Sequence, residues 1–154
     1  IVPISPNCRI GFDLGRTIVV GDNGVKVAFP DSIDVITKLV RACGGQGYII
    51  SKVTPIQEQR AKKWLHNNDF YATTGISVDQ VYFCAERADK APIAQRLGLT
   101  HFIDDRPEVL AHMEGIVPHR ILFQGNEEDL TTHQAKLRRT YRTHSWREIE
   151  KLLF

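Results

Sequence analysis

The chain has 154 residues and a mass of 17.5 kDa, the usual size of a single domain. Its 42% hydrophobic and 25% charged residues are typical of a globular protein and exclude disordered, collagen-like and coiled-coil chains. Twenty Lys and Arg against 18 Asp and Glu leave a net charge of +2. That balance argues against binding of nucleic acid or of an anionic membrane through bulk charge.

Apolar runs and cysteines give a first expectation about location. All apolar runs are too short for a transmembrane helix or for the core of a signal peptide. Cys8, Cys43 and Cys84 are odd in number and lack Cys-x-x-Cys spacing, which argues against a disulfide framework or a zinc site. We therefore expect a protein of the reducing cytoplasm with no membrane partner.

Short apolar runs recur along the chain and alternate with amphipathic stretches. They are too short for helices and too continuously apolar for a sheet with one wet face, so they predict buried parallel strands. In chain order these runs are Arg9–Phe12, Tyr48–Ile50, Val81–Phe83, His101–Ile103 and Ile121–Phe123.

The segments between the runs carry their own signals. Residues 17–29 predict a β-hairpin with an Asn23-Gly24 turn. Helix starts are expected in chain order at Asp31 or Ser32, at Thr54-Pro55 with its capping box to Gln57, at Lys90, at Pro107, at Glu127 and at Ser145 with a capping box to Glu148. The fold expected is one α/β domain over residues 1–154, a three-layer, doubly wound (Rossmann-like) parallel sheet of five strands with a small hairpin.

A basic stretch at 136–147 has two interpretations. It contains Lys136, Arg138, Arg139, Arg142 and Arg147 and no acid. These residues could contact nucleic acid. The alternative is favoured: Glu127, Glu128 and Asp129 begin a helix that the basic residues close, which complements the helix dipole.

Polar residues follow the predicted strands, where open parallel sheets bind ligands. Asp13, Ser51, Cys84, the pair Asp104-Asp105 and Gln124 stand at these ends. If the first and fourth strands are neighbours, three carboxylates converge and need a cation, for which Mg²⁺ is the natural choice. Lys90, at a helix start, would add positive charge, whereas Cys84 is best interpreted as a buried structural thiol.

This order of residues resembles the haloacid dehalogenase-like (HAD) superfamily over nearly the whole chain. The first motif, Asp-x-Asp-x-Thr/Val, stands here as Asp13-Leu14-Gly15-Arg16-Thr17. The second is Ser51, the third Lys90, and the fourth the acidic pair Asp104-Asp105. The hairpin 17–29 corresponds to the flap of that family.

The resemblance implies a phosphatase-type hydrolase. Asp13 would be the nucleophile that forms a phospho-aspartyl intermediate, and Ser51 and Lys90 would hold the phosphoryl oxygens. Mg²⁺ would be bound by Asp13, Asp105 and the Gly15 carbonyl, with Asp104 as a further ligand or as the residue that orients Asp105 or Lys90.

One position departs from the family pattern. The second Asp of the first motif, which serves as general acid and base in the family's phosphatases, is Gly15 here. The chain is then either a slow or atypical Mg²⁺-dependent phosphohydrolase or a non-catalytic module that binds phosphate and metal or supports assembly. Arg16 could contact the substrate, but a solvated arginine in the turn after the first strand is the favoured interpretation. Receiver-domain and dinucleotide-binding folds fit less well, because the acidic pair follows the fourth strand and Gly44-Gly45-Gln46-Gly47 precedes a strand.

The segments between the motifs are too short for a cap domain. We therefore expect an open catalytic rim, covered only by the hairpin. Either a macromolecular partner or a second copy of the chain would then exclude water from a phosphorylated substrate.

Overall fold

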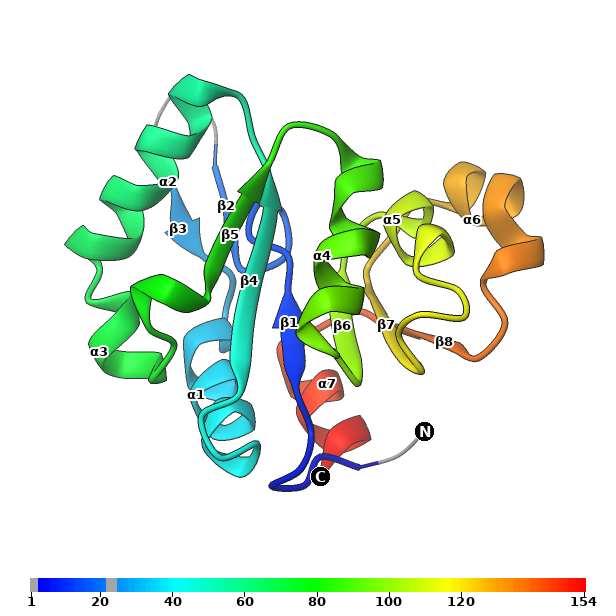
Figure 1. Ribbon diagram of the computed structural model, residues 1–154, viewed down its shortest axis with the longest axis horizontal. Helices are drawn as coiled ribbons and strands as arrows, with labels where there is room; N and C mark the ends of the chain where they lie inside the picture. Colours follow the sequence, from blue (N-terminus) through cyan, green and yellow to red (C-terminus); the bar gives the residue numbers. More distant parts are fainter. Residues whose placement is uncertain (1–2, 22–24) are drawn as a thin grey trace.

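The computed structural model describes residues 3–21 and 25–154, and its centre is a parallel sheet of six strands (Figure 1). In chain order the strands are β1 (Ile10–Phe12), β4 (Gly47–Lys52), β5 (Val81–Cys84), β6 (His101–Asp104), β7 (His119–Phe123) and β8 (Thr140–Thr143). Their order across the sheet is β5-β4-β1-β6-β7-β8, so the first strand lies in the middle. The predicted α/β class with a parallel sheet is confirmed, but the predicted number of five strands is wrong.

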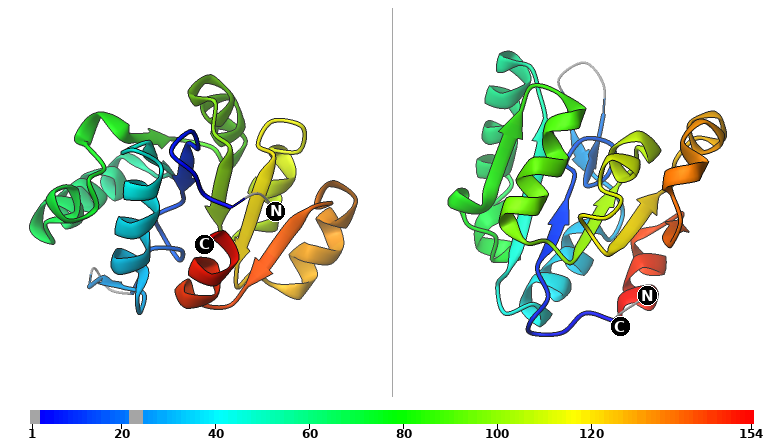
Figure 2. Two further views of the ribbon diagram at one scale, coloured as in Figure 1. Left: turned by 90° about the horizontal axis from the view of Figure 1, so that it is seen from below. Right: turned by 45° about the vertical axis from the view of Figure 1, so that its right-hand side comes forward.

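Helices cover both faces of the sheet, which gives three layers (Figure 2). One face carries α1 (Ser32–Ala42), α3 (Phe70–Thr74) and α7 (Trp146–Leu153). The other carries α4 (Lys90–Leu97), α5 (Pro107–His112) and α6 (Glu127–His133). Helix α2 (Pro55–Asn67) follows β4, and short 3-10 turns occur at Val78–Gln80, Arg87–Asp89 and Gln134–Lys136. No helix in the described parts of the chain is long and apolar enough to span a bilayer.

The strands other than β8 contribute alternate residues to two separate cores, as the two-residue period of a strand requires. On the α1 and α7 face, the strand residues of the core are Ile10, Phe12, Ile49, Ile103, Ile121 and Phe123. On the α4 and α5 face they are Tyr48, Ile50, Phe102 and Leu122. Gly11 also faces this second core, where a Cβ atom would lie only 2.6 Å from carbons of Leu99 and Phe102. Glycine is therefore required in the middle of the central strand.

The predicted hairpin is present as a small antiparallel pair beside α2. Val19 of β2 (Val19–Val20) pairs with Ala28 of β3 (Val27–Ala28). The predicted Asn23-Gly24 turn lies outside the described residues. The Trp64 indole of α2 donates a hydrogen bond to the Lys26 carbonyl oxygen at 3.1 Å, which fastens the hairpin against this helix.

Helix starts agree with most of the sequence signals. The Thr54 hydroxyl accepts from the Gln57 backbone N–H at 3.2 Å, and the Gln57 side chain accepts from the Thr54 N–H at 3.0 Å, so this capping box is confirmed. The Ser145 hydroxyl accepts from the Glu148 N–H at 3.2 Å, but the Glu148 carboxylate accepts from the N–H of His144. The second predicted capping box is thus only half formed.

The basic stretch does not close a helix, and that prediction is wrong. Helix α6 ends at His133, a 3-10 turn runs to Lys136, and Arg142 lies on the edge strand β8. The buried Arg120 guanidinium donates to the carbonyl oxygens of Leu110, Lys136 and Arg138 at 2.7–2.8 Å. These bonds draw the segment before β8 against β7, an interaction between distant residues that helix-dipole reasoning does not contain.

We expect Arg120→Met to destabilise the fold, because three carbonyl oxygens would lose a charged donor. The free energy of unfolding should fall by about 2–4 kcal/mol, measured by urea denaturation. Arg96→Met, on the exposed side of α4, is the matched control and should change it little. Equal stabilities of the two variants would contradict this account of β8.

Candidate functional site

The strand order brings the predicted site residues to one edge of the sheet. Strand β1 lies between β4 and β6, with Phe12 paired to both Ile49 and Ile103. The Asp13 N–H donates to the Ile103 carbonyl oxygen at 2.9 Å, so the chain stays in register one residue beyond β1. Ser51, Asp13 and Asp104 therefore stand at the carboxyl ends of three adjacent strands.

Lys90 forms the centre of this group. Its ammonium Nζ lies 2.8 Å from Asp13 Oδ1 and 2.9 Å from Asp104 Oδ2, and the Lys90 side chain is only 3% exposed. Asp104 is fully buried and also accepts from the Arg106 N–H at 2.9 Å. Since α4 begins at Lys90, the helix start delivers this ammonium between two buried carboxylates.

Thr17 connects the third carboxylate, that of Asp105, to Asp13. Its hydroxyl lies 3.0 Å from Asp13 Oδ2 and 3.2 Å from Asp105 Oδ1. The Trp146 indole of α7 donates to the Thr17 carbonyl oxygen at 2.9 Å and holds the turn after β1 in place. The Thr17 hydroxyl has one proton and can donate it to only one of the two carboxylates at a time. The other carboxylate can therefore accept an added proton or bind a cation.

The electrostatic balance of the group is unfavourable without a cation. Burial, and next the charge of Asp13, raise the pKa of Asp104 to about 6. Burial, followed by the charges of Asp13 and Asp104, raises the pKa of Asp105 to about 8. Burial opposes the charge of Lys90, yet Asp104 and Asp13 outweigh it and raise the pKa of this ammonium above its ordinary value. Three carboxylates thus face one ammonium.

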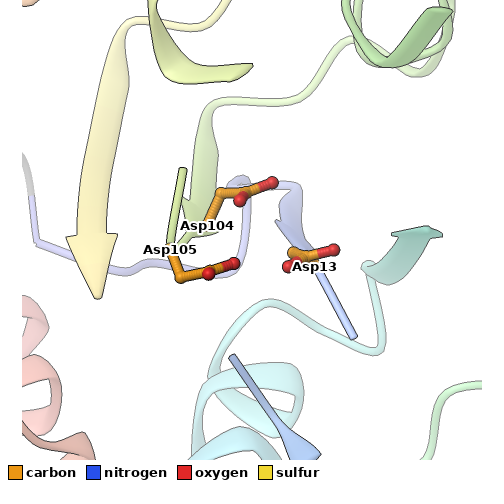
Figure 3. A group of neighbouring side chains, drawn as sticks. All are labelled: Asp13, Asp104 and Asp105. Atoms are coloured by element: carbon orange, nitrogen blue, oxygen red, sulfur yellow. The ribbon is translucent and has the colours of Figure 1, made fainter. Parts of the chain in front are cut away.

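The same three carboxylates have the composition and spacing of a divalent-metal site. Oxygen atoms of Asp13, Asp104 and Asp105 all lie within 4.8 Å of one another. Figure 3 shows them at the ends of β1 and β6, with the Asp104 and Asp105 carboxylates on the side of β6 that faces Asp13. Carboxylate oxygens are the donors that Mg²⁺ prefers, and a divalent cation would offset the excess negative charge. The residues present therefore fit such an ion.

A cavity of about 490 Å³ opens from this group. Asp13, Asp105, Lys90 and Ser51 line it, and the Ser51 hydroxyl makes no hydrogen bond with any other described residue. Gln57, Ala61 and Trp64 of α2 and Val19 and Val20 of the hairpin form a further part of the wall. The volume lies in the range of pockets for small organic ligands.

Gly15 and Arg16 also line the cavity, in different backbone states. A Cβ atom on Gly15 would meet nothing within 4 Å, so a side chain would fit there. Arg16 has a φ of 62°, a left-handed conformation that costs a residue with a Cβ about 1 kcal/mol or more. Its N–H donates to the Val19 carbonyl oxygen at 2.7 Å, which stabilises this tight turn.

Several wall residues were not singled out from the sequence. Lys52 and Arg106 directly follow Ser51 and Asp105, so adjacency to a strand end was a usable signal for them. Thr17 was recognised only as a member of the first motif, and its contact with Asp105 depends on the turn. Cys84 does not line the cavity and is half-buried, so the prediction of a buried thiol is wrong in that respect. Its thiol lies 3.7 Å from the Ser51 carbonyl oxygen, and burial raises the pKa of this thiol.

Neither a family model nor a curated protein matches the amino-acid sequence of this chain. Several solved structures resemble its fold, and they include the following three. D,D-heptose 1,7-bisphosphate phosphatase from B. bronchiseptica, complexed with magnesium and phosphate, superposes with a TM-score of 0.67 over 95% of this chain and 97% of its own, at 13% identity. A protein described as a haloacid dehalogenase-like hydrolase, from Burkholderia xenovorans LB400, gives 0.60 over 81% of this chain and 57% of its own, at 10% identity.

The third similar structure is a de novo designed Rossmann 3x3 protein, with a TM-score of 0.53 over 94% of this chain and 90% of its own, at 15% identity. A designed protein shares the general layout of sheet and helices, so the layout by itself carries no activity. The higher scores belong to the two natural proteins. This chain therefore has the Rossmann-like fold of the haloacid dehalogenase-like hydrolases.

Proposed function

We propose that the chain is a haloacid dehalogenase-like phosphohydrolase that uses Asp13 as nucleophile and Mg²⁺ as cofactor. The observation that carries the proposal is the buried contact of Lys90 with Asp13 and Asp104, at the inner end of a cavity that Ser51 and Asp105 also line. The similar phosphatase from B. bronchiseptica is complexed with magnesium and phosphate, which supports this choice of cofactor and substrate group.

Asp13, Asp105 and the Gly15 carbonyl would hold the cation. Asp104, whose carboxylate is already engaged by Lys90 and the Arg106 N–H, would orient Lys90. When bound, Mg²⁺ supplies Lewis-acid stabilisation of the phosphoryl oxygens and lowers the repulsion between the two anions.

This chain's own residues would perform the displacement. The Asp13 carboxylate attacks phosphorus, the bond from phosphorus to the ester oxygen breaks, and that oxygen leaves with the electron pair. The Ser51 hydroxyl and the Lys90 ammonium donate to the equatorial oxygens, where negative charge is concentrated. Water then attacks the phospho-aspartyl group, which releases phosphate and regenerates Asp13.

Gly15 limits the leaving groups that can be expelled. No side chain at this position can protonate the departing oxygen, and general acid help is worth roughly 10²–10⁴-fold. Esters whose oxygen leaves readily as an anion, such as aryl phosphates, should therefore react better than alkyl phosphates. The alternative function is a non-catalytic module that binds phosphate and metal in the same cavity, and Gly15 is the observation that favours it.

The first prediction from the proposed function concerns catalysis. Wild-type protein with Mg²⁺ should hydrolyse 4-nitrophenyl phosphate faster than an alkyl phosphate, and Asp13→Asn should abolish both reactions, as measured by phosphate release. Asp79→Asn, on an exposed turn away from the cavity, is the control and should keep full activity. Equal rates for the Asp13→Asn variant and the wild-type protein would exclude Asp13 as the nucleophile and would favour the non-catalytic binding module.

The second prediction concerns the missing acid. Gly15→Asp should raise the turnover of alkyl phosphates by about tenfold or more, because a carboxyl group can protonate the leaving oxygen and the position has room for it. Turnover of 4-nitrophenyl phosphate should change much less. Gly15→Asn has the same size without the acid, and an equal gain with Gly15→Asn would contradict the explanation.

The third prediction concerns Mg²⁺ and pH. Because the pKa of Asp105 is raised to about 8 and that of Asp104 to about 6, the folded metal-free protein retains protons that the unfolded chain loses above its ordinary carboxyl pKa. This contribution to stability is present at low pH and is lost as the pH rises to about 8.

Mg²⁺ needs ionised carboxylates, so its affinity should increase from pH 5 to pH 8. Calorimetric titration should show this increase in wild type and weak binding at both pH values in Asp105→Asn, with Asp79→Asn again as control. Equal affinity in wild type and Asp105→Asn would exclude the proposed ligand set.

The fourth prediction concerns the open rim. A macromolecular substrate or a second copy of the chain would exclude water from the reaction, as expected for an uncapped relative. Sedimentation velocity at micromolar concentration should therefore reveal self-association or, after mixing, binding to a phosphorylated macromolecule. A strict monomer that turns over a small phosphate ester efficiently would exclude this part of the proposal.

A further inference from the structure

The wall of the cavity is strongly cationic outside its inner end. Among residues 3–21 and 25–154, the carboxylates of the wall are Asp13 and Asp105, whereas its cationic residues are Arg16, Lys26, Lys52, Arg87, Lys90 and Arg106. The whole chain carries a net charge of only +2. Positive charge is therefore concentrated at this cavity.

In the described parts of the chain, only two of these six cations form an ion pair with a carboxylate. Lys90 is neutralised by Asp13 and Asp104, and Arg87 pairs with Glu108 at 3.4 Å. Within residues 3–21 and 25–154, no carboxylate forms an ion pair with Arg16, Lys26, Lys52 or Arg106.

The group that is hydrolysed does not account for these outer cations. A phosphoryl group beside Asp13 is already provided with Ser51, Lys90 and the proposed Mg²⁺. Arg16 in addition holds a left-handed backbone conformation that glycine would adopt without strain. Four unpaired cations in one cavity wall, Arg16 among them, fit an additional anionic group on the ligand.

We propose that the substrate is a small phosphomonoester that carries a second anionic group, a carboxylate or a second phosphate, held by Arg16 and Arg106. This inference rests on the proposed function and names the substrate class of the same site. Guanidinium groups bind carboxylate and phosphate through paired hydrogen bonds. Converging positive charge in a concave site also attracts such a ligand over a singly charged one.

The test uses two phosphonates that cannot be hydrolysed. 3-Phosphonopropionate and propylphosphonate have similar length, but only the first carries a carboxylate. With saturating Mg²⁺, calorimetry on the wild-type protein should give about tenfold tighter binding of 3-phosphonopropionate, the effect of one charge-assisted contact. Equal affinities, or no binding of 3-phosphonopropionate, would overturn the proposal.

Substitutions of Arg16 and Arg106 test whether these two residues cause the preference for 3-phosphonopropionate. Arg16→Gln and Arg106→Gln together should bring the ratio of the two affinities close to one, whereas Arg96→Gln, outside the cavity, should leave the tenfold ratio unchanged. Arg16→Gly retains the backbone conformation without strain and should reduce the ratio in the same direction, which separates ligand binding from misfolding. A ratio unchanged in the double variant would overturn the assignment.

The binding titrations test the substrate class separately from the proposed hydrolase activity. A preference for 3-phosphonopropionate without hydrolysis of any phosphate ester would refute the proposed hydrolase and keep the doubly anionic ligand. Hydrolysis that depends on Asp13, without this preference, would keep the hydrolase and refute the substrate class. A second phosphate is distinguished from a carboxylate by repeating the titration with 1,3-propylenebisphosphonate.

Discussion

The contact of the Lys90 ammonium with Asp13 and Asp104 is the interaction on which the site depends. Charges this deeply buried persist only when they are paired and hydrogen-bonded. Lys90 pairs with two carboxylates, but Asp105 adds a third. Burial, together with this leftover negative charge, raises the pKa values of Asp104 and Asp105. The same charge balance that holds these strand ends together would also favour the proposed cation.

That contact is possible because the sheet has its particular strand order. Only when β1 lies between β4 and β6 do the residues that follow these strands meet. The packing of the two cores is consistent with a central position for β1. Both faces of β1 are covered, and Gly11 leaves the space that the Leu99 and Phe102 side chains occupy. Asp13 stands just beyond β1, whose three residues are all buried, and further parts of the cavity wall come from α2, the hairpin and the turns.

Much of this could be predicted from the sequence, for identifiable reasons. Buried parallel strands have continuous apolar runs, and their ends predict where Asp13, Ser51 and the acidic pair stand. Strand β8 was missed because an edge strand needs no apolar run; it reads Thr-Tyr-Arg-Thr and is held through the distant Arg120. The link from Thr17 to Asp105 depends on the tertiary geometry of the turn after β1, which local patterns do not contain.

Gly15 and Arg16, taken together, give the site a consistent character. Gly15 removes the acid that would help an alkoxide to leave, and Arg16 adds a cation at the same wall of the cavity. A guanidinium cannot replace a general acid, because its pKa is far too high to release a proton in this reaction. It can bind an anionic substituent, and it can stabilise charge that develops on a leaving oxygen without donating the proton. In the proposed hydrolase, Gly15 and Arg16 would therefore exchange proton transfer for charge recognition, which would favour substrates that are rich in anionic groups and have oxygens that leave easily.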